Sequence, residues 1–321
     1  MKKNILSRSL FCLLPLLSIA SCTVNEKVTG GKDDEVVLNE INGYLQYGYY
    51  PQSNINDQEL LGKLNSLSGP NSHGHYSLDG NLYVKTVAPE QGSYAKSNGL
   101  QRKFHNGTIA ETGQTYWFLV EPIRWNILEK QNGEYTVMAD QILDVHEFYG
   151  SKEMRSIGGK DVYPNNYEYS DVRAWLNGDF LNQAFAYGKS HLRKTIVGNS
   201  SDTVGTGVTY AGKDTEETIY LPSYKELLNP SYRFSGDMGA DTERKRLVSD
   251  WAILQGAYCE KDWAGCYCTR SASNAQTEEP TFYYVYMVIN DGRLYSGLYV
   301  DEASAGGVDY SGIVPCAHIK A

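Results

Sequence analysis

Residues 282–290 alternate between two sets of side chains, which limits this part of the chain to an extended conformation. The side chains expected on one face are those of Tyr284, Tyr286 and Val288. Because successive side chains of a strand point to opposite sides, a period of two predicts a β-strand. Asp291-Gly292 follows, and Gly accepts the positive φ of a tight turn. Residues 293–300 then resume strand character, so the pattern predicts a hairpin near the C-terminus.

A second hairpin is predicted in the N-terminal half of the chain. Residues 116–128 and 134–139 are dense in aromatic and β-branched side chains, and Asn132-Gly133 lies between them. Asn-Gly between two such runs favours a two-residue hairpin turn. Residues 44–52 and 313–320 also have strand character, so strands are expected at both ends of the folded part.

Helical periodicity lies mainly between these strands. Residues 170–185 repeat apolar side chains at helical spacing, Ser170 is a suitable N-cap, and Gly178 can divide the segment. Further short helices are indicated by the leucine spacing in 57–67, by a capping box at 223–226 with a helix through Leu228, and by residues 247–256. The order predicts an α+β fold with a hairpin-rich, largely antiparallel sheet and two or three short helices.

The first 22 residues have the layout of an export signal. Lys2, Lys3 and Arg8 precede an apolar run that is shorter than the roughly 20 residues of a membrane-spanning helix. Small residues before Cys22 resemble the bacterial lipobox, which implies cleavage before Cys22 and a lipid on its sulfur. The alternative is an ordinary secreted protein in which Cys22 is incidental.

The organisation that we expect has three parts. These are a signal peptide at 1–21, a flexible tether at 22–38, and a single globular domain at 39–321 with a loop-rich insertion near 53–113. The tether is polar and contains Gly30-Gly31, which favours flexibility. We therefore predict an extracytoplasmic protein at the outer membrane or cell surface, held to the membrane through the lipid on Cys22.

Composition excludes some partners and suggests others. The chain has a net charge of −9 and no basic patch with interleaved aromatic residues, so nucleic acid is not an expected partner. Tyrosine is abundant, with 26 Tyr against 8 Phe. Because a buried phenol needs a hydrogen-bond partner, many of these rings are expected to be half-exposed and suited to recognition. The alternative is that tyrosine serves as a good strand former.

Four cysteines remain outside the signal and the lipidation site, namely Cys259, Cys266, Cys268 and Cys316. An even number in an oxidising compartment predicts two disulfides, with the connectivity left open. Cys266 and Cys268 would share one strand face and cannot readily bond to each other, so Cys259–Cys266 and Cys268–Cys316 are favoured. A zinc site made by all four is the alternative, although their spacing is unusual for zinc.

Several motifs occur in an order that resembles a bacterial family, domain of unknown function 6273. They are Tyr47-Gly-Tyr-Tyr-Pro-Gln52, Pro122-Ile-Arg-Trp125, Gln141-Ile-Leu-Asp144, Ser170-Asp-Val-Arg-Ala-Trp-Leu-Asn177, Leu221-Pro-Ser223, Thr269-Arg-Ser271 and Val314-Pro-Cys-Ala317. The resemblance runs from about Tyr44 to the C-terminus. It implies a secreted or surface lipoprotein and a fold similar to the C-type-lectin-like fold of formylglycine-generating enzymes, in which the terminal strands pair.

The chain departs from this family pattern at two places. The family usually has Trp-Leu-Arg-Ser where this chain has Tyr267-Cys-Thr-Arg-Ser271, and Gly-Val-Arg-Pro where it has Gly312-Ile-Val-Pro315. The second change removes an arginine that would help to line a shared pocket. Formylglycine-generating chemistry is not expected, since Cys266 and Cys268 do not match the motif of those enzymes.

Metal and catalytic signatures are weak. His73-Gly-His75 with His105 could form a metal cluster, but no Asp or Cys joins them at ligand spacing. Calcium could lie near Asn290-Asp291 and Asp301-Glu302, although turn formation and solvated acids explain these residues equally. No paired-carboxylate, nucleophile-elbow or metalloprotease signature is present. Candidate ligand-binding residues are Arg173, Arg270, Tyr284, Tyr286 and Asp291, with the arginines favoured as ties between helix and sheet.

Three functional hypotheses follow. The first is a non-catalytic binding or adhesion module for a glycan or protein outside the cell, without a cofactor. The second is an extracytoplasmic hydrolase acting on envelope or environmental polysaccharide. A cleft that contains two carboxylates of shifted pKa would favour this hypothesis. The third is a structural envelope component without a soluble ligand.

Overall fold

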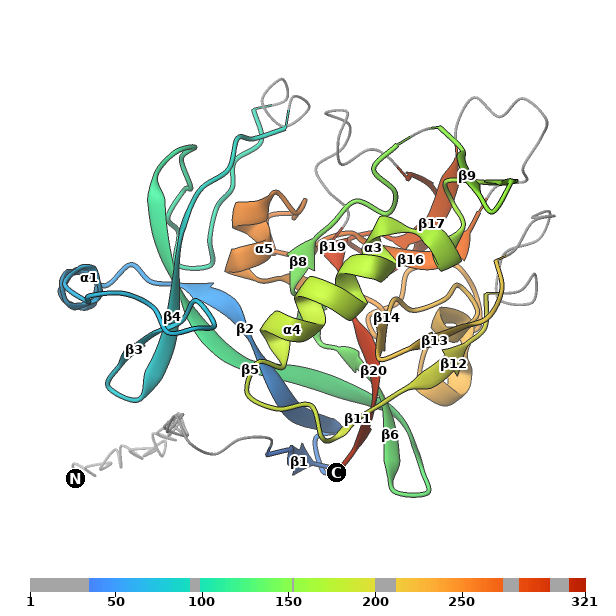
Figure 1. Cartoon of the computed structure of the whole chain (residues 1–321), viewed down its shortest axis with the longest axis horizontal. Helices are drawn as coiled ribbons and strands as arrows, with labels where there is room; N and C mark the ends of the chain where they lie inside the picture. Colours follow the sequence, from blue (N-terminus) through green and yellow to red (C-terminus); the bar gives the residue numbers. More distant parts are fainter. Residues whose placement is uncertain (1–34, 93–98, 152, 200–211, 274–282, 301–311) are drawn as a thin grey trace, which may run out of the picture.

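The computed structural model describes residues 35–92, 99–151, 153–199, 212–273, 283–300 and 312–321. Its larger sheet is built on the hairpin predicted in the N-terminal half, in which β5 spans Thr115–Gln131 and β6 spans Glu134–Ala139. Asn132 and Gly133 form the turn with φ of 53° and 78°, as their residue types predict. Strands β2 (Tyr44–Asn54) and β4 (Asn81–Val87) both pair antiparallel with β5 (Figure 1).

Five further strands extend this sheet. They are β1 (Val37–Asn39), β3 (Tyr76–Leu78), β11 (Leu192–Arg193), β14 (Ile219–Tyr220) and β20 (Cys316–Lys320). The described strands follow the order β1-β2-β5-β6-β20-β11, with β3 joined through β4 and β14 joined to β20. The first and last strands thus share one sheet, but the β5–β6 hairpin lies between them, and β20 pairs with β6. The direct pairing of terminal strands implied by the resemblance is therefore not formed.

A second sheet contains the hairpin predicted near the C-terminus. Its strands are β8 (Asp144–Val145), β16 (Tyr267–Ala272), β17 (Tyr284–Val288), β18 (Leu294–Tyr299) and β19 (Gly312–Ile313). They lie in the order β18-β17-β16-β19-β8. Gly292, in the turn between β17 and β18, has a φ of 82°. The hairpin is confirmed, although both faces of β17 are largely buried.

The strand predicted over 313–320 is divided between the two sheets. β19 ends at Ile313 in the smaller sheet, and β20 begins at Cys316 in the larger one. Pro315 lies between them and has no N–H to donate to a strand ladder. The C-terminal segment therefore connects the sheets, and a continuous buried core runs across both.

Three two-stranded ladders lie outside the large sheets. They join β7 (Gln141–Ile142) to β15 (Leu247–Val248), β9 (Arg155–Ile157) to β10 (Lys160–Val162), and β12 (Thr195–Val197) to β13 (Thr215–Glu217). The β7–β15 ladder is parallel. It ties the chain that follows β6 to the segment that leads into helix α5.

The helix predicted over 170–185 forms one continuous helical segment. α3 spans Asp171–Trp175, a π-helical turn spans Leu176–Phe180, and α4 spans Leu181–Ala184. Ser170 caps the start as expected, because its hydroxyl accepts the N–H of Arg173. Gly178 does not divide the helix; the chain widens there into the π turn. Phe180 packs on Tyr50 of β2 with ring centroids 5.0 Å apart, so the segment lies against the larger sheet (Figure 1).

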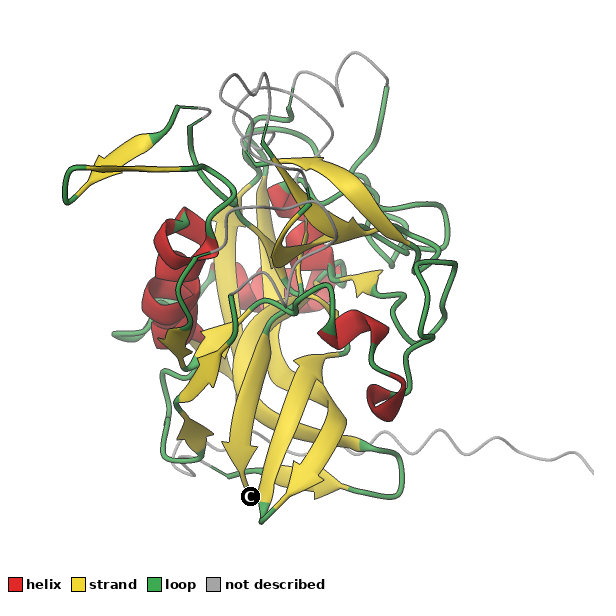
Figure 2. Ribbon diagram, turned by 90° about the vertical axis from the view of Figure 1, so that its right-hand side faces the viewer, coloured by secondary structure: helices red, strands yellow, loops and turns green. Residues whose placement is uncertain are grey.

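The other described helices are short. They are α1 (Gln58–Asn65), α5 (Asp250–Gln255), and 3-10 turns at Tyr167–Tyr169, Glu226–Leu228 and Pro230–Tyr232. The capping box forms, since Ser223 and Glu226 bond each other's backbone N–H groups at 2.7 and 3.1 Å. Only one turn follows, because Pro230 holds Asn229 in an extended conformation. Short helices among predominantly antiparallel strands confirm the α+β class (Figure 2).

The described tyrosines divide between half-buried positions, as expected for many of them, and the core. Those buried in the described residues are Tyr47, Tyr50, Tyr83, Tyr135, Tyr149, Tyr167, Tyr220, Tyr267, Tyr283 and Tyr286. Partners are supplied inside the protein: the Tyr47 hydroxyl donates to the carbonyl of Gly188 at 3.2 Å, and that of Tyr267 to the carbonyl of Arg244 at 2.8 Å. The buried tyrosines therefore serve strand and core formation.

The turn between β17 and β18 provides a test of this packing. A Cβ on Gly292 would lie 1.8 Å from the carbonyl oxygen of Asp241, so Gly292→Ala is expected to lower the free energy of unfolding by more than about 2 kcal/mol. Gly133→Ala is the control, because Gly133 has a similar φ and no atom within 4 Å of an added Cβ. It should lose about 1–2 kcal/mol. Equal losses in chemical denaturation would contradict the close approach.

Candidate functional site

The two arginines singled out from the sequence bind protein groups. Arg270 is buried and donates to both carboxylate oxygens of Glu226, at 2.6 and 2.9 Å, and to the carbonyl of Leu221. Burial alone would raise the pKa of Glu226, but the Arg270 charge and hydrogen bonds hold it below its usual value. Arg173 pairs with the buried carboxylate of Glu217. Both arginines thus tie helical segments and loops to strands, as favoured from the sequence.

The other predicted ligand-binding residues are Tyr284, Tyr286 and Asp291. Like the two arginines, they do not line the cavity between residues 99–103 and 253–263. Tyr286 is buried, with its ring centroid 4.3 Å from that of Tyr224. Tyr284 is half-buried on β17, and its carbonyl accepts from Asn165. Asp291 caps the N–H of Arg293 at 3.0 Å and pairs with its guanidinium at 3.1 Å, which is turn chemistry. Asp301-Glu302, the other calcium candidates, lie outside the described residues.

The structure does not form the expected disulfides Cys259–Cys266 and Cys268–Cys316. Cys268 lies on β16 opposite Met287, whereas Cys316 lies on β20 of the other sheet, opposite Met138. Cys266 accepts a backbone hydrogen bond from Asn290, and burial raises the pKa of its thiol to about 11. Cys259 instead borders a cavity. Placement in different sheets accounts for the absent Cys268–Cys316 bond, whereas Cys259 lies opposite Gly265, next to Cys266, without being bonded to it.

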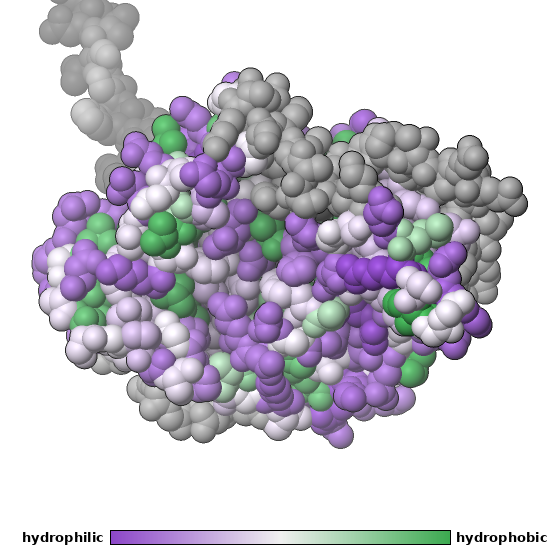
Figure 3. Space-filling model, turned by 45° about the horizontal axis from the view of Figure 1, so that its top comes forward, coloured by the Kyte–Doolittle hydropathy of each residue, from purple (hydrophilic) through white to green (hydrophobic). Residues whose placement is uncertain are grey.

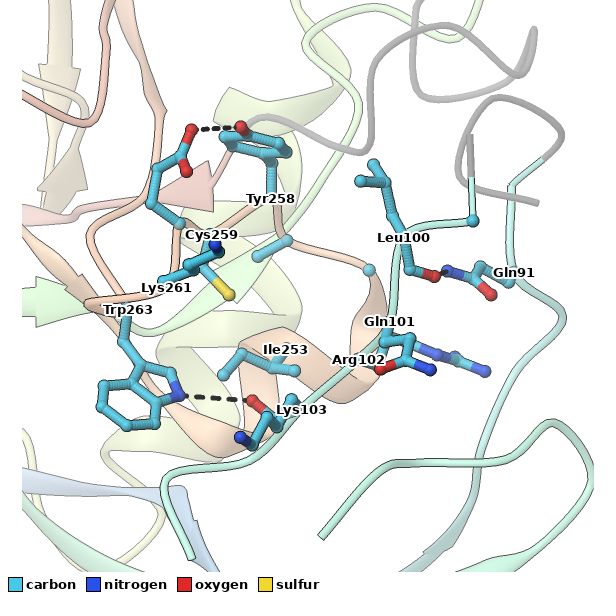
Figure 4. A pocket seen from close by; sticks show the side chains of 14 residues that line it. Gln91, Leu100, Gln101, Arg102, Lys103, Ile253, Tyr258, Cys259, Lys261 and Trp263 are labelled. Atoms are coloured by element: carbon cyan, nitrogen blue, oxygen red, sulfur yellow. Dashed lines mark hydrogen bonds between the residues drawn. The ribbon is translucent and has the colours of Figure 1, made fainter. Parts of the chain in front are cut away.

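A cavity of about 560 Å³ lies between two segments that are far apart in the sequence. One wall is residues 99–103, which follow the β3–β4 hairpin, and the other is residues 253–263, which include the end of α5 (Figure 4). Apolar side chains of Leu100, Ile253 and Ala257 line it together with aromatic rings, and lysines stand beside them. This volume is in the range of small-molecule binding sites.

Arg102 fixes the first wall. Its side chain is buried and donates to the carbonyls of Pro89 and Leu254, both at 2.9 Å, and to the hydroxyl of Thr112 at 3.1 Å. Leu254 lies in the last turn of α5, where carbonyls without an intrahelical partner attract a cation. One guanidinium therefore holds the 99–103 segment against the helix that forms the cavity floor.

Trp263 fixes the second wall in an unusual conformation. Its φ is 59°, a region that bulky residues rarely adopt. Its backbone N–H donates to the carbonyl of Glu260 and its carbonyl accepts from Val248, both at 2.9 Å. The indole N–H donates across the cavity to the carbonyl of Lys103 at 3.3 Å (Figure 4). The edge-on ring of His105 lies 4.9 Å away, so the indole is held from several sides.

The cavity offers little for acid–base chemistry. Glu260 is the one carboxylate among its described lining residues, and it accepts a hydrogen bond from the Tyr258 hydroxyl. Asp144 and Glu121, whose pKa values are raised by burial, do not line it. Asp144 is enclosed by the Tyr50 hydroxyl and the Trp251 indole N–H. Two converging carboxylates of the kind that glycoside hydrolases use are not among the described lining residues.

Sequence reasoning did not identify this cavity. Only Cys259 had been singled out, and for another role. Both walls are irregular loops, and no periodic pattern connects residues that lie about 150 positions apart. The one available signal was an isolated Trp263 in a polar turn, where a large aromatic ring has no strand or helix face to cover.

A strand-rich α+β domain with an aromatic and partly basic cavity is the class that these features define. The chain belongs to the family described as Domain of unknown function (DUF6273), whose model matches residues 132–321. The match begins later than the resemblance noted from Tyr44 onward, so it includes the 253–263 wall but not the 99–103 wall. No curated protein and no solved structure matches the chain. Among the described helices, none combines the length and apolarity needed to cross a membrane.

The histidine pair considered as a metal site forms part of an aromatic contact. The His75 Nδ1 atom is 2.8 Å from the Tyr187 hydroxyl, which also accepts from the Asn71 amide. His73 lies beside the same ring, with centroids 5.3 Å apart. In the described part of the chain, no three His, Cys, Asp or Glu residues gather as a metal would require. The cluster joins the loop before β3 to the segment after α4.

This cluster predicts an acid sensitivity. Burial, and then the charge of His73, lower the pKa of His75 to about 4. The unfolded chain binds the proton more readily than the folded chain between pH 6.5 and 4, so the free energy of unfolding should fall across that window as pH falls, by up to about 3 kcal/mol from this group. His75→Gln should flatten this part of the pH dependence in denaturation curves, whereas the exposed control His73→Gln should largely retain it. An unchanged slope in His75→Gln would contradict the assignment.

Proposed function

We propose that the protein is a surface lipoprotein whose domain is a non-catalytic binding module for a glycan outside the cell. The observation that carries this proposal is the cavity between residues 99–103 and 253–263, with Trp263 and Tyr258 on one wall. Aromatic rings offer flat apolar faces to the C–H groups of sugars, and polar groups at the rim orient the hydroxyls. A protein ligand is the other outcome open to the same module.

The position of the cavity suits a tethered receptor. The edge strand β1 includes the last two residues of the expected tether and pairs with residues 44–46 at the beginning of β2. The far end of β2 contacts the cavity floor, because the Asn54 N–H donates to Asp250 of α5 at 2.9 Å. Eight residues of strand, about 26 Å, separate these points. Figure 1 shows β1 and α5 in correspondingly distant parts of the molecule, so the cavity lies away from the end of the domain to which the tether would be attached.

The surface also suits a ligand smaller than a protein partner. On the face in Figure 3, hydrophobic residues are scattered among hydrophilic ones and form no broad continuous patch. Stable protein interfaces usually have an apolar centre of substantial area. A small polar ligand in a defined cavity needs no such patch.

We further infer that the domain is a divergent C-type-lectin-like fold. The terminal strands lie in one sheet, and a late hairpin, β17–β18, pairs with the strand that carries the Thr269-Arg-Ser271 motif. The β5–β6 hairpin between the terminal strands is the departure from that fold. An experimental structure with unrelated strand connectivity would refute the inference.

The proposed lipid anchor can be tested by substitution of Cys22. Cys22→Ser should abolish incorporation of labelled fatty acid and shift the protein from the membrane to the soluble extracytoplasmic fraction, because the lipid is the proposed anchor. Cys12→Ser is the matched control, since Cys12 leaves with the signal peptide and should leave both properties unchanged. Membrane retention of Cys22→Ser at the original level would reject the lipoprotein proposal.

The proposed glycan binding can be tested on a glycan array. The lipidated protein in detergent should bind a subset of a glycan array, and Trp263→Ala should weaken that binding at least about tenfold, the loss of one stacked aromatic contact. Tyr295→Ala is the control, because Tyr295 is an exposed aromatic residue on β18 away from the cavity. An array without any bound glycan would refute the proposal, and specific capture of one protein would favour the protein-ligand alternative.

A further inference from the structure

The cavity is locally basic in an acidic protein. The whole chain has a net charge of −9, yet the cavity is bordered by Lys103 on one wall and Lys261 on the other. Both side chains are exposed, and among the described residues neither ammonium group has an ion pair or a side-chain hydrogen bond. The two positive charges are therefore available to a ligand.

The neighbouring acids form no ion pair with these lysines in the described residues, although Glu260 and Asp250 keep their negative charge because they bond only neutral groups. Glu260 accepts from the Tyr258 hydroxyl. Asp262 pairs with Lys245 at 2.7 Å. Asp250, below the cavity, accepts the backbone N–H groups of Asn54 and His105 at 2.9 and 2.7 Å. Among the described lining residues, the positive charges of Arg102, Lys103 and Lys261 outnumber the single negative charge of Glu260, which favours an anionic group between the two walls.

The indole of Trp263 is placed to complement such a group. Its N–H is satisfied by the carbonyl of Lys103, so the ring can offer a ligand its π face and does not need the N–H as a donor. Because Lys103 supplies that carbonyl, its ammonium lies within one lysine side chain of the indole. Lys103 and Trp263 thus border the same part of the cavity, which allows one ligand to contact both.

The backbone of Trp263 supports a functional reason for this placement. A bulky residue at φ 59° has a strained backbone. The strain is maintained by the turn with Glu260 and the bond from Val248. An asparagine or glycine would satisfy the same turn without that strain, so the indole is retained at a position that backbone conformation disfavours.

We propose that the cavity binds a saccharide carrying a carboxylate or sulfate group, with the anion between Lys103 and Lys261 and the sugar ring on Trp263. The inference rests on the glycan-binding function proposed above and names its ligand class. The two lysines would attract and orient the anion, and the apolar walls would cover the ring.

The test compares three oligosaccharides of equal length, namely tetragalacturonate, a sulfated galactose tetramer and a neutral galactose tetramer. Calorimetry with the lipidated protein in detergent should give at least about tenfold tighter binding of an acidic oligomer than of the neutral one. The tighter of the two acidic oligomers identifies the anion. Added salt should weaken the acidic binding selectively.

Variants separate the charge from the rest of the site. Lys103→Gln with Lys261→Gln should remove about tenfold of the preference for the acidic oligomer over the neutral one. Lys160→Gln, an exposed lysine on β10, is the matched control and should leave that preference unchanged. Trp263→Asn relieves the backbone strain and removes the ring, so it should weaken binding of both oligomers while leaving the melting temperature unchanged or higher.

The outcomes distinguish this inference from the proposed function. Equal affinity for neutral and acidic oligomers, lost in Trp263→Asn, would overturn the anionic preference and keep the glycan-binding site. Binding of no oligomer would overturn both. Acidic binding that survives the double lysine variant would place the anion elsewhere and overturn the inference.

Discussion

The guanidinium of Arg244 organises the loops on which both sheets depend. It is fully buried and donates to the carbonyls of Gly292, Leu227 and Asp237 at 2.8, 3.0 and 2.9 Å, with two further carbonyls of the same loop beside them. Its own carbonyl accepts the hydroxyl of Tyr267 on β16. A buried charge without partners costs several kcal/mol, and arginine cannot give up its proton. The loop, the β17–β18 turn and β16 must therefore assemble together around this one group.

Hydrogen bonds from arginine side chains to backbone carbonyls also hold the segments around the cavity. Arg246 donates to the carbonyl of Ala139 at the end of β6, and its own carbonyl accepts from Gly265 at 3.0 Å. The strained Trp263 lies two residues before Gly265 and is bonded to Val248. Across the cavity, Arg102 holds the opposite wall to α5. Buried arginines thus supply the rigidity that two irregular loops lack, and a preformed cavity loses less entropy when a ligand binds.

The fold was predictable where local interactions decide it. The turns at Asn132-Gly133 and Asp291-Gly292, the cap at Ser170 and the capping box at 223–226 depend on a few neighbouring residues, and the structure contains all of them. Prediction failed where distant groups decide: the strand expected over 313–320 is divided at Pro315 between two sheets. The cavity was beyond prediction for the same reason, since its walls meet only through long-range contacts made by groups such as Arg102.

The central claim is that the cavity between these arginine-held walls is the ligand-binding site. Hydrogen–deuterium exchange of the lipidated protein, with and without a saturating acidic oligosaccharide, tests it most directly. The account predicts slower exchange in peptides covering residues 99–103 and 256–263, with little change in β17 and β18. Protection confined to the β17–β18 hairpin, or to any surface away from both walls, would contradict it.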